Sequence, residues 1–180
     1  EEAGGRGGEE AGAQKQKPVI WCGDLNVAPT EMDVTDARFF ISQKPDKPPP
    51  TPPATGDRGQ PGFTENERMR FNALLEEANL VDVWRHLHGA ERDYSWRGHP
   101  GVSTVGRFRG HGMRIDHHIV PRSLLPRVRS CEFSTAGFEL AQLVHRHVDA
   151  FFGSDHCALT LTLAPDNGKE EAEEEEEEGA

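Results

Sequence analysis

The sequence predicts a single domain in which strands and helices are mixed, and three observations support this. Strand-like segments begin near Val19, Arg114, Val128 and Ala158; the first is a continuous apolar run, and the last alternates between apolar and polar residues. Apolar residues recur at helical spacing between residues 65 and 78. The length of 180 residues suits one ordinary domain and is short for two.

Low-complexity sequence borders this domain, which we place at residues 18–164. Residues 1–17 mix Glu, Gly, Ala, Lys and Gln without apolar periodicity, and residues 165–180 form an acidic tail, so both are expected to be disordered. These ends carry most of the net charge of -11, so a polyanionic partner is not excluded. Within the domain we expect a proline-rich loop at about 42–61 and a helical insertion at about 137–152.

Local patterns predict the individual elements. The continuous apolar run 19–22 predicts a strand buried on both faces, and Thr64 with Glu67 is the capping box of a helix over 65–78. Residues 80–84 start either a short helix or an extended segment. The remaining expectations are strands at 94–96, 114–120 and 128–133 and a helical turn at 123–125.

The cysteines and the hydropathy limit the class of protein. Cys22, Cys131 and Cys157 show no C-x-x-C spacing, so neither a disulfide partner nor a zinc site is expected. No apolar run reaches the roughly 18 residues of a membrane span, and no signal-peptide pattern is present. We expect a soluble protein with reduced thiols.

Polar residues stand at the tips of three strand-like segments. Asp24 and Asn26 follow the first strand, Asp116 lies in a later one, and Asp155 with His156 precedes the last. Such a set suits a hard divalent metal ion combined with proton transfer. Strand alternation predicts that Asp24 and Asn26 point to the same side.

Each residue of this set has a chemical role open to it. Asp155 suits a metal ion and His156 a reacting phosphate, while Asp116 orients the imidazole. Asp24 positions or deprotonates a water, and Asn26 holds that water or a phosphate oxygen.

Simpler interpretations remain for every motif taken alone. An Asp-His pair after a turn is more often an ordinary loop hydrogen bond, and the histidines at 117, 118, 145 and 147 fit no zinc spacing. Residues 97–129 hold seven Arg and one acid, which indicates either a nucleic-acid contact or a solvated surface.

The order of the motifs resembles one family, the C-terminal half of the exonuclease III type apurinic/apyrimidinic endonucleases of the endonuclease/exonuclease/phosphatase superfamily. The resemblance covers roughly residues 18–163, and the Arg-Ile-Asp segment favours the DNA-repair branch over the inositol phosphatases. The matching motifs are Trp21-Cys22-Gly23-Asp24-Leu25-Asn26-Val27-Ala28-Pro29, Gly62-Phe63-Thr64 with Glu67, Arg68 and Phe71, Asp82-Val83-Trp84-Arg85, Tyr94-Ser95-Trp96, Arg114-Ile115-Asp116 and Gly153-Ser154-Asp155-His156-Cys157.

This resemblance implies an α/β, DNase I-like fold, of which the chain is half: a four-layered α/β sandwich with two packed mixed β-sheets flanked by helices. It implies hydrolysis of the DNA backbone 5′ to abasic sites in base excision repair, with Mg²⁺ as cofactor and Mn²⁺ as an alternative. Activities of the 3′-phosphodiesterase or 3′→5′ exonuclease type often accompany it. The partner is then double-stranded DNA with abasic sites, and we expect the nucleus, with cytoplasm or an organelle as alternatives.

The resemblance also assigns residues by position. The catalytic set is Asp24, Asn26, Asp116 and His156, and the metal set is Asp155, Asp24, Asn26 and His156. The abasic-sugar pocket falls on Trp96, Met113 and Ile115. The arginines expected to contact DNA are Arg97, Arg107, Arg109 and Arg114.

Three departures keep other hypotheses open. His117 stands where an aromatic or aliphatic residue is usual, Ala158 replaces a usual Pro, and the family's N-terminal half with its metal-binding Glu is missing. The chain is then either a fragment of a longer protein or a degenerate copy. A catalytically dead remnant that binds nucleic acid or a protein, or a phosphoesterase for a small phosphorylated substrate, are the alternatives.

Overall fold

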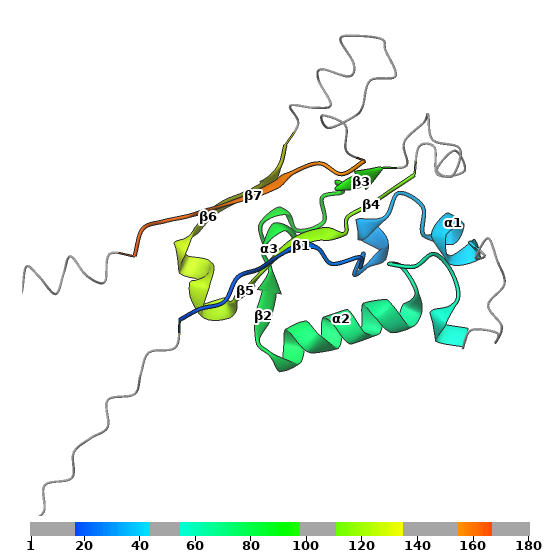
Figure 1. Ribbon diagram of the computed structural model, residues 1–180, viewed down its shortest axis with the longest axis horizontal. Helices are drawn as coiled ribbons and strands as arrows, with labels where there is room; N and C mark the ends of the chain where they lie inside the picture. Colours follow the sequence, from blue (N-terminus) through cyan, green and yellow to red (C-terminus); the bar gives the residue numbers. More distant parts are fainter. Residues whose placement is uncertain (1–16, 44–54, 98–110, 135–154, 167–180) are drawn as a thin grey trace, which may run out of the picture.

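The computed structural model describes residues 17–43, 55–97, 111–134 and 155–166 (Figure 1). The proposed helical insertion, most of both low-complexity ends, part of the proline-rich loop, and Arg107 and Arg109 lie outside these ranges. Strands and helices are mixed along the described chain, which is the expected α/β fold.

A three-stranded sheet with the order β1-β5-β2 forms the centre of the described chain. Its strands are β1 (Trp21–Asp24), β5 (Asp116–Pro121) and β2 (Leu80–Asp82), and both pairings are antiparallel. The register sets Asp24 directly opposite Asp116, so two of the predicted site residues meet at one end of the sheet.

Two further strand pairs extend the structure, and both are antiparallel. Strand β3 (Trp96–Arg97) pairs with β4 (Gly112–Met113), and β6 (Val128–Phe133) pairs with β7 (Leu159–Leu163). Every pairing between named strands in the described ranges is thus antiparallel, whereas the resemblance implied mixed sheets. Short helices connect them: η1 (Glu31–Asp33), α1 (Ala37–Ser42), η2 (Thr55–Asp57), α3 (Val83–His88) and η4 (Arg122–Arg127).

Helix α2 (Glu65–Glu77) runs along one side of the central sheet (Figure 1). The predicted capping box is present, because Thr64 accepts from the Glu67 amide and Glu67 accepts from the Thr64 amide. The helix ends before Asn79, whose φ of 51° is the left-handed conformation common after helix ends. The chain then enters β2 directly, so residues 80–84 contain the whole of this short strand and the start of helix α3.

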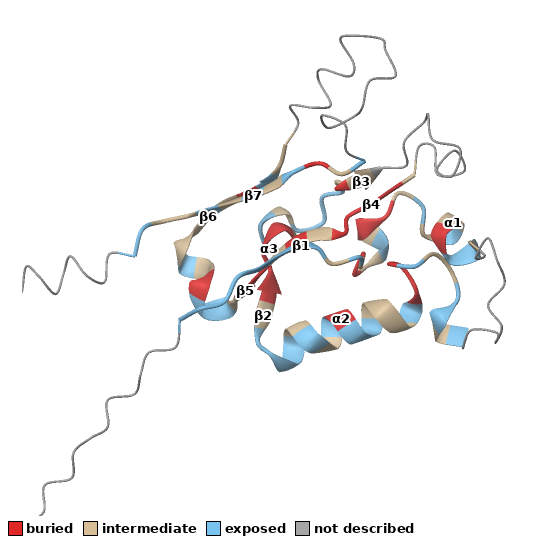
Figure 2. Cartoon of the chain, viewed as in Figure 1, coloured by how far each residue is buried: buried red, intermediate tan, exposed pale blue. Residues whose placement is uncertain are grey.

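The buried apolar residues form two hydrophobic clusters. Figure 2 shows where the buried residues lie along the chain. One surrounds the β4 side of the molecule and comprises Ala28, Val34, Phe40, Phe63, Met113 and Ile115. The other lies between α3, β5 and the β6–β7 pair and comprises Val83, Trp84, Val120, Leu124 and Cys131. The predicted strand at 128–133 is confirmed as β6.

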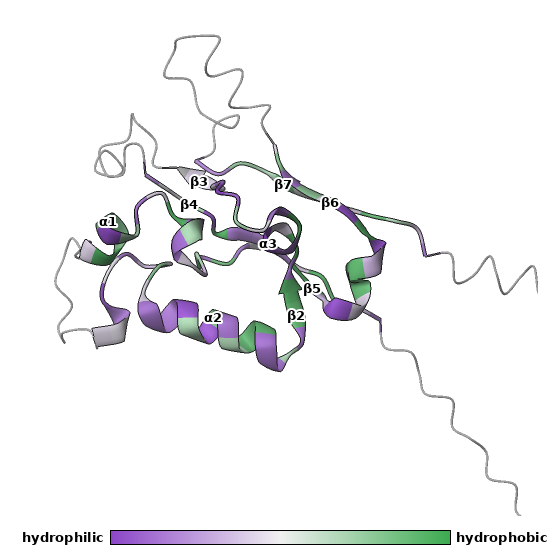
Figure 3. Ribbon diagram, turned by 180° about the vertical axis from the view of Figure 1, so that it is seen from behind, coloured by the Kyte–Doolittle hydropathy of each residue, from purple (hydrophilic) through white to green (hydrophobic). Residues whose placement is uncertain are grey.

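The prediction of a first strand buried on both faces is wrong. Strand β1 starts at Trp21, lies at the edge of its sheet, and has all four residues exposed. Val19 exposes 72% of its surface, and Ile20 and Trp21 each expose 40%. Apolar sequence near the start of this strand therefore faces solvent, and Figure 2 colours β1 as exposed. Figure 3 gives the hydropathy of the same chain seen from behind. Among the described helices, none has the length and apolar character to cross a membrane.

Candidate active site

Asp116 and His156 lie in direct contact, although 40 residues separate them in the sequence. The Nδ1 atom of His156 is 2.8 Å from Oδ2 of Asp116. An antiparallel β-bridge to Trp96 holds the histidine there, and it includes the hydrogen bond that the Cys157 amide donates to the Ser95 carbonyl at 2.8 Å. The structure thus brings the predicted acid–imidazole pair together.

The pKa values of both residues are shifted in the direction that favours their charged forms. The hydrogen bond to Asp116 raises the pKa of His156, against the effect of partial burial, and the charges of Asp116, Asp24 and Asp155 add to the increase. Burial acts to raise the pKa of Asp116, but hydrogen bonds from His156 and Ser95 hold it below its usual value. Each group therefore stabilises the charged form of the other.

Ser95 is a site residue that sequence reasoning missed. It is fully buried, and its hydroxyl oxygen accepts the amides of Ile115 and Asp116, each at 3.0 Å. These two donors occupy both lone pairs, so the hydroxyl proton is left for the Asp116 carboxylate. The sequence feature that could have identified it is the position of this small hydroxyl residue between two aromatic residues, Tyr94 and Trp96.

Asp24 and Asn26 lie at the open end of the same sheet. Asp24 ends β1, and its Oδ2 atom is 4.0 Å from Nε2 of His156. The Asn26 amide donates to Oδ1 of Asp24 at 2.8 Å, which closes a tight turn. Asn26 has a φ of 51°, so the strand alternation used to place both side chains on one side does not extend to it.

Asp155 is an exposed carboxylate on the same side of the site. Its Oδ2 atom accepts the indole N–H of Trp96 at 2.9 Å. Asp155, Asp24 and Asn26 offer the oxygen ligands that Mg²⁺ prefers, and Mg²⁺ needs only one or two carboxylates from a protein. However, the described residues contain no group of three or more His, Cys, Asp or Glu side chains that could hold a metal ion.

His156 differs from the other three members of the predicted metal set. A metal ion binds the neutral imidazole, whereas hydrogen bonding to Asp116 raises the pKa of His156 and favours its protonated form. The geometry therefore favours His156 as a proton donor or charge-stabilising group over His156 as a ligand.

The three residues predicted for the sugar pocket lie together, with different exposure. Met113 is paired with Trp96 across β3 and β4, and Ile115 follows in the same cluster. Met113 and Ile115 expose 2% and 6% of their surface, while Trp96 is only partly buried. In this structure Trp96 packs against the hydrophobic cluster that contains Met113 and Ile115. The role of these residues toward a sugar stays a prediction.

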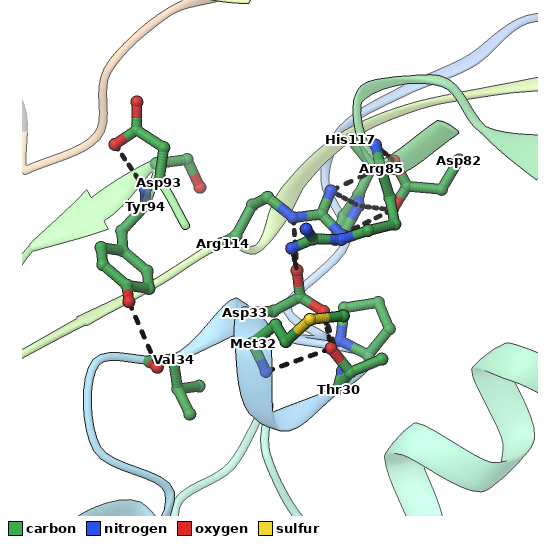
Figure 4. A network of polar contacts seen from close by, with 12 residues as sticks. Thr30, Met32, Asp33, Val34, Asp82, Arg85, Asp93, Tyr94, Arg114 and His117 are labelled. Atoms are coloured by element: carbon green, nitrogen blue, oxygen red, sulfur yellow. Dashed lines mark hydrogen bonds and ion pairs between the residues drawn. The ribbon is translucent and has the colours of Figure 1, made fainter. Parts of the chain in front are cut away.

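Arg114 does not lie on a DNA-contacting surface, so that prediction is wrong. Its side chain is fully buried. Figure 4 shows its guanidinium between Asp33 and Asp82, with Nε 2.6 Å from Asp33 and Nη2 2.7 Å from Asp82. Burial acts to raise the pKa of both carboxyls. The charge and hydrogen bond of Arg114 hold the pKa of Asp33 below its usual value, and the hydrogen bond to His117 together with the Arg114 charge does the same for the pKa of Asp82. This arginine is used for structure, because its guanidinium contacts two internal acids, His117 and the ring of Trp84.

Comparison with known sequences points to one family. The Endonuclease/Exonuclease/phosphatase family matches residues 6–156. A DNA-(apurinic or apyrimidinic site) endonuclease of Arabidopsis thaliana is 44% identical over 151 residues, covering 82% of this chain and 38% of that protein. An exodeoxyribonuclease of Bacillus subtilis is 31% identical and is covered over 46% of its length. The chain therefore spans less than half the length of these relatives.

Solved structures show the same fold at lower identity. An AP endonuclease from Leishmania major superposes with a TM-score of 0.53 at 24% identity, over 82% of this chain and 35% of that chain. A 3′ phosphatase from Neisseria gives a TM-score of 0.57 at 19% identity, over 84% of this chain and 47% of that chain.

Proposed function

Because the chain belongs to the Endonuclease/Exonuclease/phosphatase family, we propose that it is part of a DNA-repair phosphodiesterase that hydrolyses the DNA backbone 5′ to abasic sites. The observation that carries this proposal is the joint position of Asp24, Asp116 and His156 at one sheet end. The names of the sequence relatives support DNA as the substrate. The 3′-phosphodiesterase and 3′→5′ exonuclease activities are further reactions of the same phosphodiester chemistry.

The chain's own residues supply proton transfer and charge stabilisation. His156, held protonated by Asp116, presents Nε2 toward the open site, where it stabilises the negative charge that develops on a phosphate oxygen or donates a proton to it. Asp24 accepts a proton from the attacking water, since its Oδ1 is held by the Asn26 amide and its Oδ2 faces the site. Asn26 is exposed and supplies an amide to a water or phosphate oxygen.

A divalent metal ion, which we propose to be Mg²⁺, completes the site. It would be held by Asp155 together with Asp24 and Asn26, and when bound it supplies positive charge that neutralises the reacting phosphate. The described residues provide ligands of the right kind but too few for a dedicated site. We therefore propose that the rest of the domain, outside this chain, contributes a further carboxylate.

Such an enzyme acts on double-stranded DNA, and we propose the nucleus as its location, with the cytoplasm or an organelle as alternatives. Trp96 is the residue best placed to touch a sugar beside the phosphate, because it is partly exposed and is fixed by the Asp155 carboxylate.

The test is incision of a labelled duplex with one abasic site by the full-length gene product. We expect Mg²⁺-dependent cleavage that is lost in His156→Ala. The matched control is His86→Ala, because His86 is an exposed histidine on α3 that makes no contact with the site.

Two results would contradict the proposal. Equal incision by His156→Ala and wild type would remove the imidazole from the reaction. DNA binding without incision in every variant would instead favour a remnant that only binds nucleic acid, and hydrolysis restricted to small phosphate esters would favour a different substrate class.

A further inference from the structure

His117 is a buried histidine whose side chain points to the opposite face of β5 from that of Asp116. It follows Asp116 in the strand, and successive side chains of a strand point to opposite faces. It exposes 1% of its surface and packs 5.3 Å, centroid to centroid, from the ring of Phe71 in α2. Both ring nitrogens must therefore find hydrogen-bond partners inside the protein.

The proton on one of these nitrogens follows from its partner. Nε2 of His117 lies 2.8 Å from the carbonyl oxygen of Val27, and a carbonyl can only accept. Nε2 must then carry a hydrogen. Nδ1 lies 3.1 Å from Nη1 of Arg114 and 3.2 Å from Oδ2 of Asp82, so it has a partner whether it accepts or donates. The bond to Val27 persists in both cases.

This bond reaches the turn that carries two proposed catalytic groups. Val27 directly follows Asn26, whose backbone is left-handed with a φ of 51°. Two backbone hydrogen bonds hold the same turn. The Leu25 amide donates to the Ile115 carbonyl at 2.9 Å, and the Ala28 amide donates to the Gly62 carbonyl at 2.7 Å. His117 adds a side-chain bond at the carbonyl between these two anchors.

The other ring nitrogen of the histidine contacts Arg114, whose side chain is fully buried and bound to two carboxylates. Arg114 binds Asp82 through both Nη atoms, at 3.1 and 2.7 Å, and Asp33 through Nε (Figure 4). The position of His117 is therefore determined by a charged network with little freedom to move.

We propose that His117 is a positioning residue: its Nε2–H group holds the Val27 carbonyl and thereby fixes the left-handed turn from which Asn26 projects. The role in catalysis rests on the function proposed above. The role in the turn does not, because it concerns the backbone of the free protein.

The test compares His117→Phe with His117→Gln by NMR on the 180-residue chain. Phenylalanine keeps an aromatic ring against Phe71 but lacks the donor, while glutamine supplies an amide N–H to the same carbonyl. In wild type and His117→Gln we expect the strong intraresidue amide-to-Hα NOE of a left-handed Asn26. In His117→Phe we expect this NOE to weaken, and the Ala28 amide to exchange about tenfold faster through local opening.

Two outcomes overturn the proposal. An unchanged Asn26 NOE and Ala28 exchange rate in His117→Phe would show that the turn does not need the donor. Equal changes in His117→Gln and His117→Phe would show that ring shape, and not the hydrogen bond, holds the turn. If His117→Phe does not fold, ¹⁵N spectra of wild-type His117 decide: a hydrogen on Nε2 at neutral pH supports the proposal, and its absence overturns it.

A kinetic measurement on the full-length gene product connects the turn with catalysis. We expect His117→Phe to lower kcat for abasic-site incision about tenfold with KM nearly unchanged, because a displaced group costs rate more than binding. His117→Gln should restore kcat. A wild-type kcat in His117→Phe overturns the catalytic role. If wild type does not incise, the proposed function fails, and the NMR comparison still decides the role of His117.

Discussion

The imidazole of His156 is bound through Nδ1 to the carboxylate of Asp116 at 2.8 Å, while its Nε2 atom faces Asp24 at 4.0 Å. The histidine therefore has one nitrogen fixed by a structural partner and the other directed toward the open end of the sheet. The first prediction follows from this division of roles.

Replacing Asp116 with Asn should lower the pKa of His156, because the hydrogen bond to Asp116 is the largest cause of its increase. ¹H–¹³C NMR titration of the His156 ring measures this directly in the chain as it is. In the full-length protein we expect turnover to fall about 10²–10⁴-fold with little change in DNA affinity. Asp57→Asn, on the exposed helix η2, is the control. An unchanged His156 pKa would show that Asp116 does not stabilise the protonated form of His156.

The same pair predicts how stability depends on pH. The folded pKa of His156 is raised, so its contribution is complete below about pH 6.5, the ordinary histidine value, and is lost as pH rises through the folded pKa. The folded pKa of Asp116 is lowered, so its contribution is present above its ordinary value and is lost as pH falls through the folded pKa.

Urea unfolding at about pH 5 and pH 9 tests this, since the first value lies between the two ordinary pKa values of about 3.9 and 6.5. The free-energy difference between wild type and His156→Gln should be larger at the lower pH. A difference that is equal at both values, or larger at the higher pH, would contradict the assigned protonation states.

The buried network around Arg114 predicts a large loss of stability in Arg114→Met. The substitution leaves Asp33 and Asp82 without their main partner, and breaking a buried ion pair from one side typically costs about 3–5 kcal/mol. The matched control is Arg122→Met on the exposed face of η4, where the expected change is within about 0.5 kcal/mol. Urea midpoints measure both. Similar losses in the two variants would mean that Arg114 stabilises only through side-chain volume.

Local patterns in the sequence determined the elements that depend on near neighbours. Helix α2 was predictable because Thr64 and Glu67 cap it through contacts three residues apart. Strand β6 was likewise predicted at the bounds it has in the structure, residues 128–133. The exposure of β1 could not be predicted in the same way. The apolar character of residues 19–22 indicates that these side chains favour burial, but it does not indicate whether another element packs against them.

The site shows the same division. Asp24, Asp116 and His156 were identified by motif, and the structure brings them together. The burial of Arg114 depends on its ion pairs with Asp33 and Asp82, which are 81 and 32 residues away in the sequence. No local pattern distinguishes an arginine on a surface from one whose acids lie that far off in sequence.

The thiols should differ strongly in reactivity. Cys22 is exposed, whereas burial, with the nearby charges of Asp82 and Glu132, raises the pKa of Cys131 to about 12. Cys157 is buried as well. Because the thiolate is the reactive form, Ellman's reagent should label one thiol quickly in the folded chain and all three in denaturant. Cys22→Ser should abolish the fast phase, and persistence of that phase would show that a buried thiol is accessible.

Exposed apolar residues on β1 and α2 predict that the isolated chain associates. Val19, Ile20 and Trp21 expose 72%, 40% and 40% of their surface, and Met69 and Leu74 expose 60% and 43%. Trp21 lies 6.5 Å, centroid to centroid, from the buried Phe71 of α2, so the strand and the helix lie next to each other. Open strand edges and contiguous apolar surface favour self-association.

We expect this surface to be covered by the remainder of the domain, because the chain spans only 38% of its Arabidopsis relative. The isolated chain should then bind the dye ANS, self-associate in size-exclusion chromatography, and show weak or no Mg²⁺-dependent incision of an abasic duplex. The full-length product should lose ANS binding and gain activity. Trp21→Ser together with Val19→Ser should reduce association of the isolated chain without creating activity. Robust incision by the isolated chain, abolished by His156→Ala, would contradict this expectation and show that its own residues complete the metal site.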